Sequence, residues 1–437
     1  MFRLFGKING QMDAYRVKMT KLPLKPADQR KKRELSPQRS TLAHMKWLQR
    51  IPAFLSRTTS SGRYLPEVDG FRFVAIMPVL IQHLSERLQR YSDIAWAQPL
   101  EDDFSVYLSS RGTIGVFIFF AISGFILALP FAQHHLEGSS KPRLKTYLLR
   151  RLTRLEPPYI LWMSCFFVIL LMKGGWTFGH LLPHYLASIV YLHNLTFLDY
   201  SAINPVAWSL EIEVQFYLLA PLLTAIFFRQ KNKQKRRILL IGSIFLLLLL
   251  QNLLAWHQIP YKFTLLWHLH HFLVGFLVAD FYLTDWKNSE KKAWWLLDVV
   301  AVLAFFTLCF TWSDDFWKRL IFTGALLILF VAGFRGKFFP LLLKNAWIAA
   351  IGGMCYTIYL IHLPLMEGLI QVSHHLVWTN IFVCNLILQF IVVIPVVLSI
   401  SAVGYLLFEK PFMDKYWPEK WKARWNEWRY DFQLIKK

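Results

Sequence analysis

The stretch GTIGVFIFFAISGFILALPFA, residues 112–132, contains no charged side chain. A membrane-spanning α-helix needs about 20 consecutive apolar residues, because each residue rises 1.5 Å and the hydrocarbon core is about 30 Å thick. Nine further apolar runs occur at residues 71–90, 158–173, 206–228, 238–256, 263–283, 294–312, 319–335, 346–366 and 380–408. The sequence therefore predicts an all-α, polytopic integral membrane protein with about ten transmembrane helices.

The composition of the whole chain agrees with a membrane protein. Hydrophobic residues make up 55% of the 437 residues and charged residues only 17%, whereas a soluble protein usually carries about 25% charged residues. Lys and Arg number 49 against 27 Asp and Glu, a net charge of +22. A nucleic-acid binder could have that excess of positive charge, but not with so few charges overall, so we expect no nucleic-acid partner.

The basic residues are concentrated in alternate loops. If the amino-terminal tail is cytoplasmic, segments 1–63, 133–157, 229–237, 284–293, 335–345 and 409–437 contain 41 of the 49 basic residues. Because cytoplasmic loops are enriched in Lys and Arg, we predict that both termini are cytoplasmic. The predicted organisation is a basic tail at residues 1–63, a ten-helix membrane domain at 64–413 and a second basic tail at 414–437.

Two segments outside the predicted spans are unusual. Met45 to Arg57 has apolar residues at helical spacing between basic ones, so it is either a helix lying on an anionic membrane surface or part of a disordered tail that sets topology. Residues 174–205 are too rich in aromatic residues and histidine to be freely solvated. We expect that loop to lie on, or dip into, the outer half of the protein.

We predict no metal site and no disulfide framework. The four cysteines stand in apolar segments at scattered spacing, which is typical of small buried hydrophobic residues. His268, His270 and His271 lie close together, but no carboxylate or cysteine follows at ligand spacing. We therefore interpret these histidines as interfacial residues.

Two ionisable residues of the first predicted span, Arg72 and His83, stand eleven positions apart. An ionisable side chain inside a span costs about 2.5–3.5 kcal/mol even on lenient scales, so such residues usually face an internal cavity. Eleven residues turn an α-helix to within about 20° of three full turns, which puts both side chains on one face about 16 Å apart. The alternative for His83 is a core histidine bonded to a neighbouring carbonyl group.

Two other elements place polar groups near the predicted spans. Ser123 lies near the middle of the second span, where a Ser-Gly pair also commonly marks close helix packing. Arg150 or Arg151 shares a helical face with Arg154 at the cytoplasmic boundary of the third span. These arginines could form a phosphate site, because guanidinium groups bind phosphate well. An equal alternative is that they are the positive charges that mark the cytoplasmic end of the span.

The outer half of the predicted bundle holds further titratable groups. Glu211 and Glu213 near the start of the fourth span point to different faces, so at most one lines a given cavity. Tyr359 and His362 share a face of the ninth span. The predicted order across the membrane is arginines at the cytoplasmic face, a histidine and a serine in the middle, and acid-base groups in the outer half. This order suits an anionic donor that binds from the cytoplasm and an acceptor that arrives from outside.

These residues fall in motifs that resemble the membrane acyltransferase family 3, O-acyltransferases that modify surface polysaccharides. The resemblance covers about residues 65–413, and its motifs stand at residues 69–83, 119–125, 150–159, 208–217, 356–362 and 408–411. Two departures are Phe73, where the family often has glycine, and Glu156, which replaces a common aromatic residue beside the expected phosphate site. No hydrolase block of the Gly-Asp-Ser type occurs, so we expect the membrane domain, without a fused hydrolase domain, to transfer directly to its acceptor.

The resemblance implies a donor that is acetyl-CoA or another acyl-CoA, with no tightly bound cofactor. The implied acceptor is a sugar hydroxyl of a surface or lipid-linked glycan, such as lipopolysaccharide, and the implied location is the bacterial cytoplasmic (inner) membrane with its lipids as partners. Under this hypothesis Arg72, with the arginines of residues 150–154, holds the coenzyme phosphates.

His83 would then act as general base or as a covalent acyl relay. Glu213 or His362 would orient it or move its proton, and Ser123 with Tyr359 would bind the oxyanion. The alternative function is a proton-coupled transporter or flippase of an anionic glycolipid. A membrane scaffold would leave the ionisable groups inside the spans unexplained.

Overall fold

The computed structural model describes residues 50–57, 64–287 and 294–414, and in addition residues 417, 419, 421, 422 and 425. The predicted tails at 1–63 and 414–437 therefore lie largely outside the described residues. Of the segment Met45 to Arg57, residues 50–55 are helical and Leu55 is buried.

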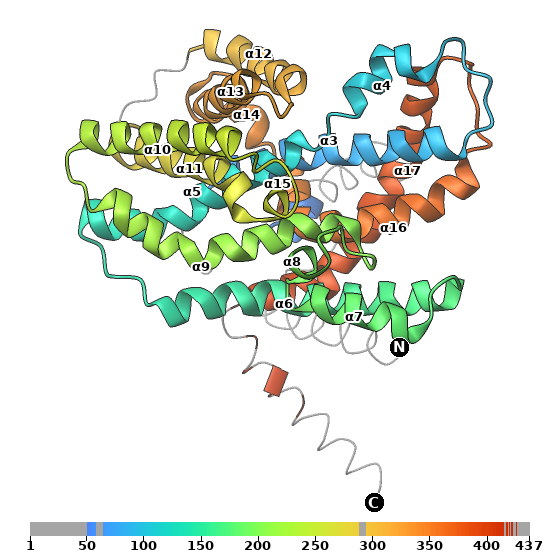
Figure 1. Cartoon of the computed structure of the whole chain (residues 1–437), viewed down its shortest axis with the longest axis horizontal. Helices are drawn as coiled ribbons and strands as arrows, with labels where there is room; N and C mark the ends of the chain where they lie inside the picture. Colours follow the sequence, from blue (N-terminus) through green and yellow to red (C-terminus); the bar gives the residue numbers. More distant parts are fainter. Residues whose placement is uncertain are drawn as a thin grey trace, which may run out of the picture. The chain divides into compact units, whose positions relative to one another are not determined.

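The described part of the chain is built from α-helices and contains no β-strand, as Figure 1 shows. The all-α prediction is confirmed. The α-helices are α3 (Pro66–Tyr91), α4 (Phe104–Ser109), α5 (Ile114–Glu137), α6 (Leu144–Lys173), α7 (Phe178–Ile189), α8 (His193–Phe197), α9 (Trp208–Phe228), α10 (Lys233–Leu253), α11 (Leu265–Phe281), α12 (Leu296–Thr311), α13 (Phe316–Arg335), α14 (Phe339–Leu343), α15 (Ala346–Gly353), α16 (Cys355–Ser373) and α17 (Phe382–Gly404).

Short turns of 3₁₀- or π-helix lie between or extend these helices. They are η2 (Leu100–Asp102), η3 (Pro205–Ala207), η4 (Tyr261–Phe263), η5 (Tyr282–Trp286), η6 (Tyr405–Glu409) and η7 (Lys410–Met413).

Each of the ten predicted spans coincides with a helix, although the ninth divides into α15 and α16. Among the described residues, eight helical segments are long and apolar enough to cross a membrane. Helix α3 is not one of the eight, and its 26 residues include six that are charged. Helix α12, with 16 residues, is too short. The count of ten crossings therefore stays a prediction.

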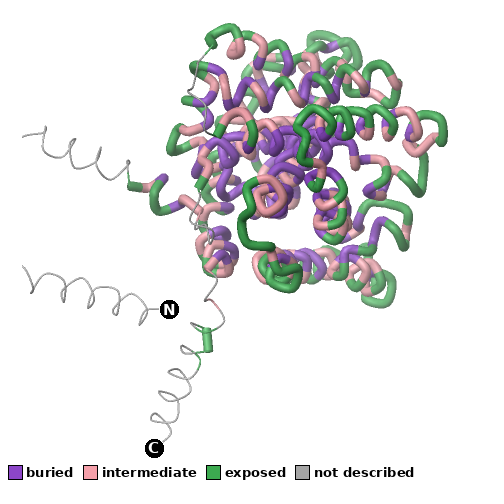
Figure 2. Tube along the Cα trace, turned by 90° about the vertical axis from the view of Figure 1, so that its left-hand side faces the viewer, coloured by how far each residue is buried: buried purple, intermediate pink, exposed green. Residues whose placement is uncertain are grey.

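Helices α5 and α11 pack closely against each other, and most residues of both are buried. Figure 2 shows how buried residues gather in the middle of the helical part of the chain. Two glycines make the crossing close. A Cβ on Gly124 would overlap the carbonyl oxygen of Phe272, and a Cβ on Gly275 would overlap that of Ala121. Small residues let backbones approach in membrane helices. The Ser-Gly pair therefore does mark close packing, at its glycine.

The segment between α6 and α9 folds into the protein. Ser188, Asn194 and Ser201 are buried, and the Asn204 side-chain amide donates to the carbonyl of Leu360 at 2.9 Å. Helices α7 and α8 belong to this segment. The expectation that residues 174–205 are not a free loop is confirmed.

We expect Gly124→Val to destabilise the fold by about 1–3 kcal/mol, since the added atoms meet backbone that cannot move aside. The matched control is Gly242→Val in α10, where an added Cβ meets nothing within 4 Å. Thermal unfolding of both variants in detergent measures the difference. Equal melting temperatures would contradict the role of this crossing.

Candidate active site

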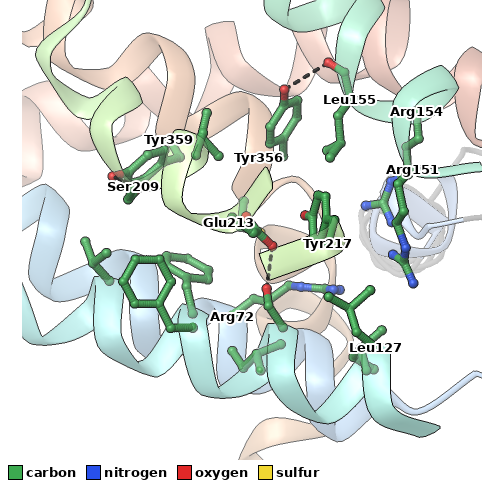
Figure 3. A pocket seen from close by; sticks show the side chains of 18 residues that line it. Arg72, Leu127, Arg151, Arg154, Leu155, Ser209, Glu213, Tyr217, Tyr356 and Tyr359 are labelled. Atoms are coloured by element: carbon green, nitrogen blue, oxygen red, sulfur yellow. Dashed lines mark hydrogen bonds between the residues drawn. The ribbon is translucent and has the colours of Figure 1, made fainter. Parts of the chain in front are cut away.

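One cavity lies between α3, α5, α6, α9 and α16, and its empty space, with the open mouth included, is about 830 Å³. Six of the nine site residues predicted from sequence line it, as Figure 3 shows for most of them. These six are Arg72, Ser123, Arg151, Arg154, Glu213 and Tyr359.

Three arginines line one part of the cavity. Arg72 comes from α3 and forms a salt bridge with Asp69, whereas Arg151 and Arg154 come from one face of α6. Arg154 Nη2 lies 3.8 Å from Glu409 Oε1, and its Nε is buried with no hydrogen-bond partner among the described residues. Arg150, by contrast, is exposed and does not line the cavity.

A hydroxyl-carboxylate pair occupies the middle of the cavity. Ser123 on α5 donates a hydrogen bond to Glu213 on α9, which is the dashed line beside Glu213 in Figure 3. The pair joins two helices across the cavity. In this arrangement the Ser123 proton is directed at the carboxylate.

Tyr359 and Ser209 lie at the end of the cavity away from Arg151 and Arg154 in Figure 3. The Tyr359 hydroxyl donates to the Val206 carbonyl at 3.0 Å and lies 2.7 Å from Ser209 Oγ. Because the tyrosine has one proton, Ser209 donates to Tyr359. The first turn of α9 and the η3 turn before it thus contact α16 at this end of the cavity.

His83 and His362 lie beyond Tyr359 and do not line the cavity. Their ring centroids are 5.1 Å apart, and that of His362 is 5.8 Å from that of Tyr359. His362 Nδ1 donates to the carbonyls of Tyr359 at 2.8 Å and Ile358 at 3.1 Å. Its Nε2 is buried without a hydrogen-bond partner in the described part of the chain.

His83 has a carboxylate partner that sequence reasoning missed. His83 Nδ1 lies 2.9 Å from Glu86 Oε2, one helical turn further along α3. Arg87 also contacts Glu86, at 2.8 Å, and reaches Glu367 of α16 at 3.2 Å. The signal in the sequence was the spacing of three residues from His83 to Glu86, which puts the two on one face.

Glu211, two residues before Glu213, serves a different part of the structure. It is fully buried and its Oε2 accepts a hydrogen bond from the Asn194 backbone amide at 2.8 Å, at the start of α8. The two carboxylates point to different faces, as predicted, and only Glu213 lines the cavity.

The histidines of α11 differ from their predicted interfacial setting. His268, His270 and His271 are all buried, and His271 stacks on Phe117 with the ring planes 3° apart. The physical reason is that α11 is surrounded by α5, α10 and α13. Among the described residues no group of three His, Cys, Asp or Glu side chains is arranged to hold a metal ion.

Apolar helices of membrane-spanning length around a polar cavity define a helical integral membrane protein. Residues 65–406 match the acyltransferase domain family, so the chain belongs to that family. It is 27% identical over 330 residues to the O-acetyltransferase OatA of Staphylococcus aureus, a match that covers 70% of this chain and 51% of the relative.

A second relative is the peptidoglycan O-acetyltransferase OatA of Listeria monocytogenes, 27% identical over 192 residues, which cover 41% of this chain and 28% of the relative. The chain therefore spans about half the length of the Staphylococcus relative it matches, and less of the Listeria one. No solved structure matches the chain.

Glu211 and Glu213 allow a matched stability test. We expect Glu211→Ala to lower the free energy of unfolding by about 1–3 kcal/mol, because buried donors at the start of α8 lose their acceptor. Glu213→Ala should change stability less, since its partner Ser123 lines a cavity. Thermal unfolding in detergent measures both, and a larger loss for Glu213→Ala would contradict this assignment.

Proposed function

We propose that this protein is a membrane O-acetyltransferase that moves an acetyl group from cytoplasmic acetyl-CoA to a hydroxyl of a cell-surface polysaccharide. The observation that carries the proposal is the polar cavity, with three arginines in one part and hydroxyl and carboxylate groups in the rest. Family membership and the names of the relatives support the same reaction. They also favour group transfer over the transport of a glycolipid.

The donor would bind with its phosphates at Arg72, Arg151 and Arg154. Guanidinium groups recognise phosphate through paired hydrogen bonds. The two carboxylates nearby, Asp69 and Glu409, leave this group of three arginines with an excess of positive charge. The acyl-bearing arm would extend from the arginines along the cavity toward Ser209 and Tyr359.

His83 would act as the general base. With Nδ1 held by Glu86, its Nε2 is the atom that accepts a proton, and the carboxylate stabilises the imidazolium that forms. The acceptor hydroxyl gives its proton to His83 Nε2 while its oxygen bonds to the thioester carbonyl carbon. The carbon–sulfur bond then breaks, and the coenzyme sulfur takes the proton from the imidazolium.

The remaining predicted residues would assist this transfer. His362 lies between Tyr359 and His83, where it can relay a proton or hold the His83 ring. Ser123 and Tyr359 donate to Glu213 and to Val206 in this structure. Each hydroxyl must therefore turn away from its present acceptor before it can stabilise an oxyanion.

The proposal includes a location and an orientation. We place the domain of residues 64–413 in a bacterial cytoplasmic membrane with both termini inside. The arginines then lie toward the cytoplasm, where acetyl-CoA is made, and the histidine pair lies toward the outside, where a polysaccharide arrives.

We expect His83→Ala to lower O-acetylation of the surface polysaccharide at least about 100-fold, because general base catalysis contributes 10²–10⁴-fold. Base-labile acetate on the purified polysaccharide measures the effect, and an immunoblot of membranes checks the protein level. The matched control is His375→Ala, an exposed histidine after α16. Wild-type acetylation in the His83 variant would rule out His83 as the base.

Glu86→Gln should cause a smaller loss, about tenfold, because it removes a charge-assisted hydrogen bond but leaves the imidazole in place. The rate of thiol release from acetyl-CoA by membranes with acceptor polysaccharide measures it. The double variant with His83→Ala should be no slower than His83→Ala alone. Losses that multiply in the double variant would show that Glu86 acts independently of His83.

A further inference from the structure

The chain just before the family domain is linked to one cavity arginine, Arg72, through a single carboxylate, Asp69. The acyltransferase match begins at residue 65, and the sequence predicts a tail up to residue 63. Yet Arg57 Nη1 donates to Asp69 Oδ1 at 2.9 Å, and the Arg57 side chain is only 10% exposed. Lys410, close after η6, donates to the Phe54 carbonyl and fixes the same segment.

Asp69 is shared between two guanidinium groups. Its Oδ1 accepts from Arg57 and also from Arg72, and the Asp69 side chain is only 3% exposed. Arg72 lines the cavity, whereas Arg57 and Asp69 do not. Arg57 is therefore one residue removed from the cavity and acts on it through Asp69.

The protein has a place shaped for the Arg57 side chain. A Cβ on Gly353 at the end of α15 would lie 3.1 Å from Arg57 Cγ, so any larger residue there would crowd the arginine. Burial lowers the pKa of the Arg57 guanidinium, but the combined attraction of Asp69, Glu409 and other nearby groups raises that pKa overall. Arg57 thus stays a cation beside the cavity.

Sharing of the carboxylate changes what Arg72 can do. With both arginines present, one negative charge faces two positive charges, and Arg72 is held in place but only partly neutralised. Without Arg57, Arg72 would be the one guanidinium left in hydrogen-bond contact with Asp69 among the described residues, and Asp69 would cancel more of its charge. The cavity arginines would then attract an anion less strongly.

We propose that Arg57 is a positioning residue of the donor site: it shares Asp69 with Arg72 and so keeps the Arg72 guanidinium oriented and charged for a phosphate of acetyl-CoA. This inference rests on the proposed function. It extends the donor site to the segment of residues 50–57, outside the domain that defines the family.

The test is calorimetric binding of acetyl-CoA to the purified full-length protein in detergent, which needs no acceptor. Arg57→Gln should lower the affinity for acetyl-CoA roughly tenfold, which is the size of effect expected for one charge-assisted contact. Arg57→Lys, which keeps the charge but lacks the planar fork, should weaken it roughly threefold. Neither variant should change the affinity for S-acetylpantetheine, which carries the acyl arm without phosphates.

Arg50→Gln is the matched control, because Arg50 is an exposed arginine at the start of the same segment, residues 50–57. The Arg50→Gln variant should bind acetyl-CoA and S-acetylpantetheine with wild-type affinity. Arg151→Gln should lower the affinity for acetyl-CoA. If Arg57→Gln does not fold, Arg57→Lys decides, and wild-type acetyl-CoA affinity in it overturns the inference.

Two further results would overturn the role of Arg57 and leave the proposed function standing. One is wild-type affinity of Arg57→Gln for acetyl-CoA while Arg151→Gln binds it weakly. The other is an equal loss of affinity for acetyl-CoA and for S-acetylpantetheine in Arg57→Gln, which would indicate a structural role. No acetyl-CoA binding by the wild-type protein would overturn the proposed function and this inference together.

Discussion

The structure depends on one constraint: polar groups on apolar helices must find partners inside the protein, because lipid offers none. Helices α3, α5, α6, α9 and α16 therefore turn their polar side chains toward one another. Ser123 pairs with Glu213, Ser209 with Tyr359, and Asn204 with the α16 backbone. The polar side chains around the cavity are therefore held by partners on neighbouring helices.

Much of the architecture was predictable from sequence, since a membrane requires long apolar runs that are visible by length alone. A turn of 100° per residue predicts a common face for Arg72 and His83, but of the two only Arg72 lines the cavity. The sequence also put Glu211 and Glu213 on different faces. It could not tell which one lines the cavity, because that depends on α8, whose backbone amide meets Glu211 only in the folded protein.

Sequence reasoning missed Glu86 and Arg57 because the contacts of both side chains are visible only in the folded protein. Glu86 lies inside the first predicted span, but the sequence alone does not show that its side chain meets the His83 ring rather than another helix. Arg57 reaches Asp69 from a segment that looks like a basic tail in the sequence. Its position becomes visible only in the folded protein, where it contacts Asp69 and packs beside Gly353. Conversely, Arg150 is of the same residue type as Arg151 but lies on the exposed side of α6. The two neighbours are separated by 100° of helix turn, which residue type alone does not reveal.

The charge balance around the arginines bears on how such a site can work repeatedly. A guanidinium fully paired with its own carboxylate is neutralised and binds phosphate weakly, whereas one with no partner in a buried site is costly to keep charged. Asp69 shared by Arg57 and Arg72, and Glu409 held 3.8 Å from Arg154 by its bonds to Thr357, lie between these limits. Under the proposed function, this balance would keep the arginines compatible with the fold and still leave positive charge for the donor phosphates.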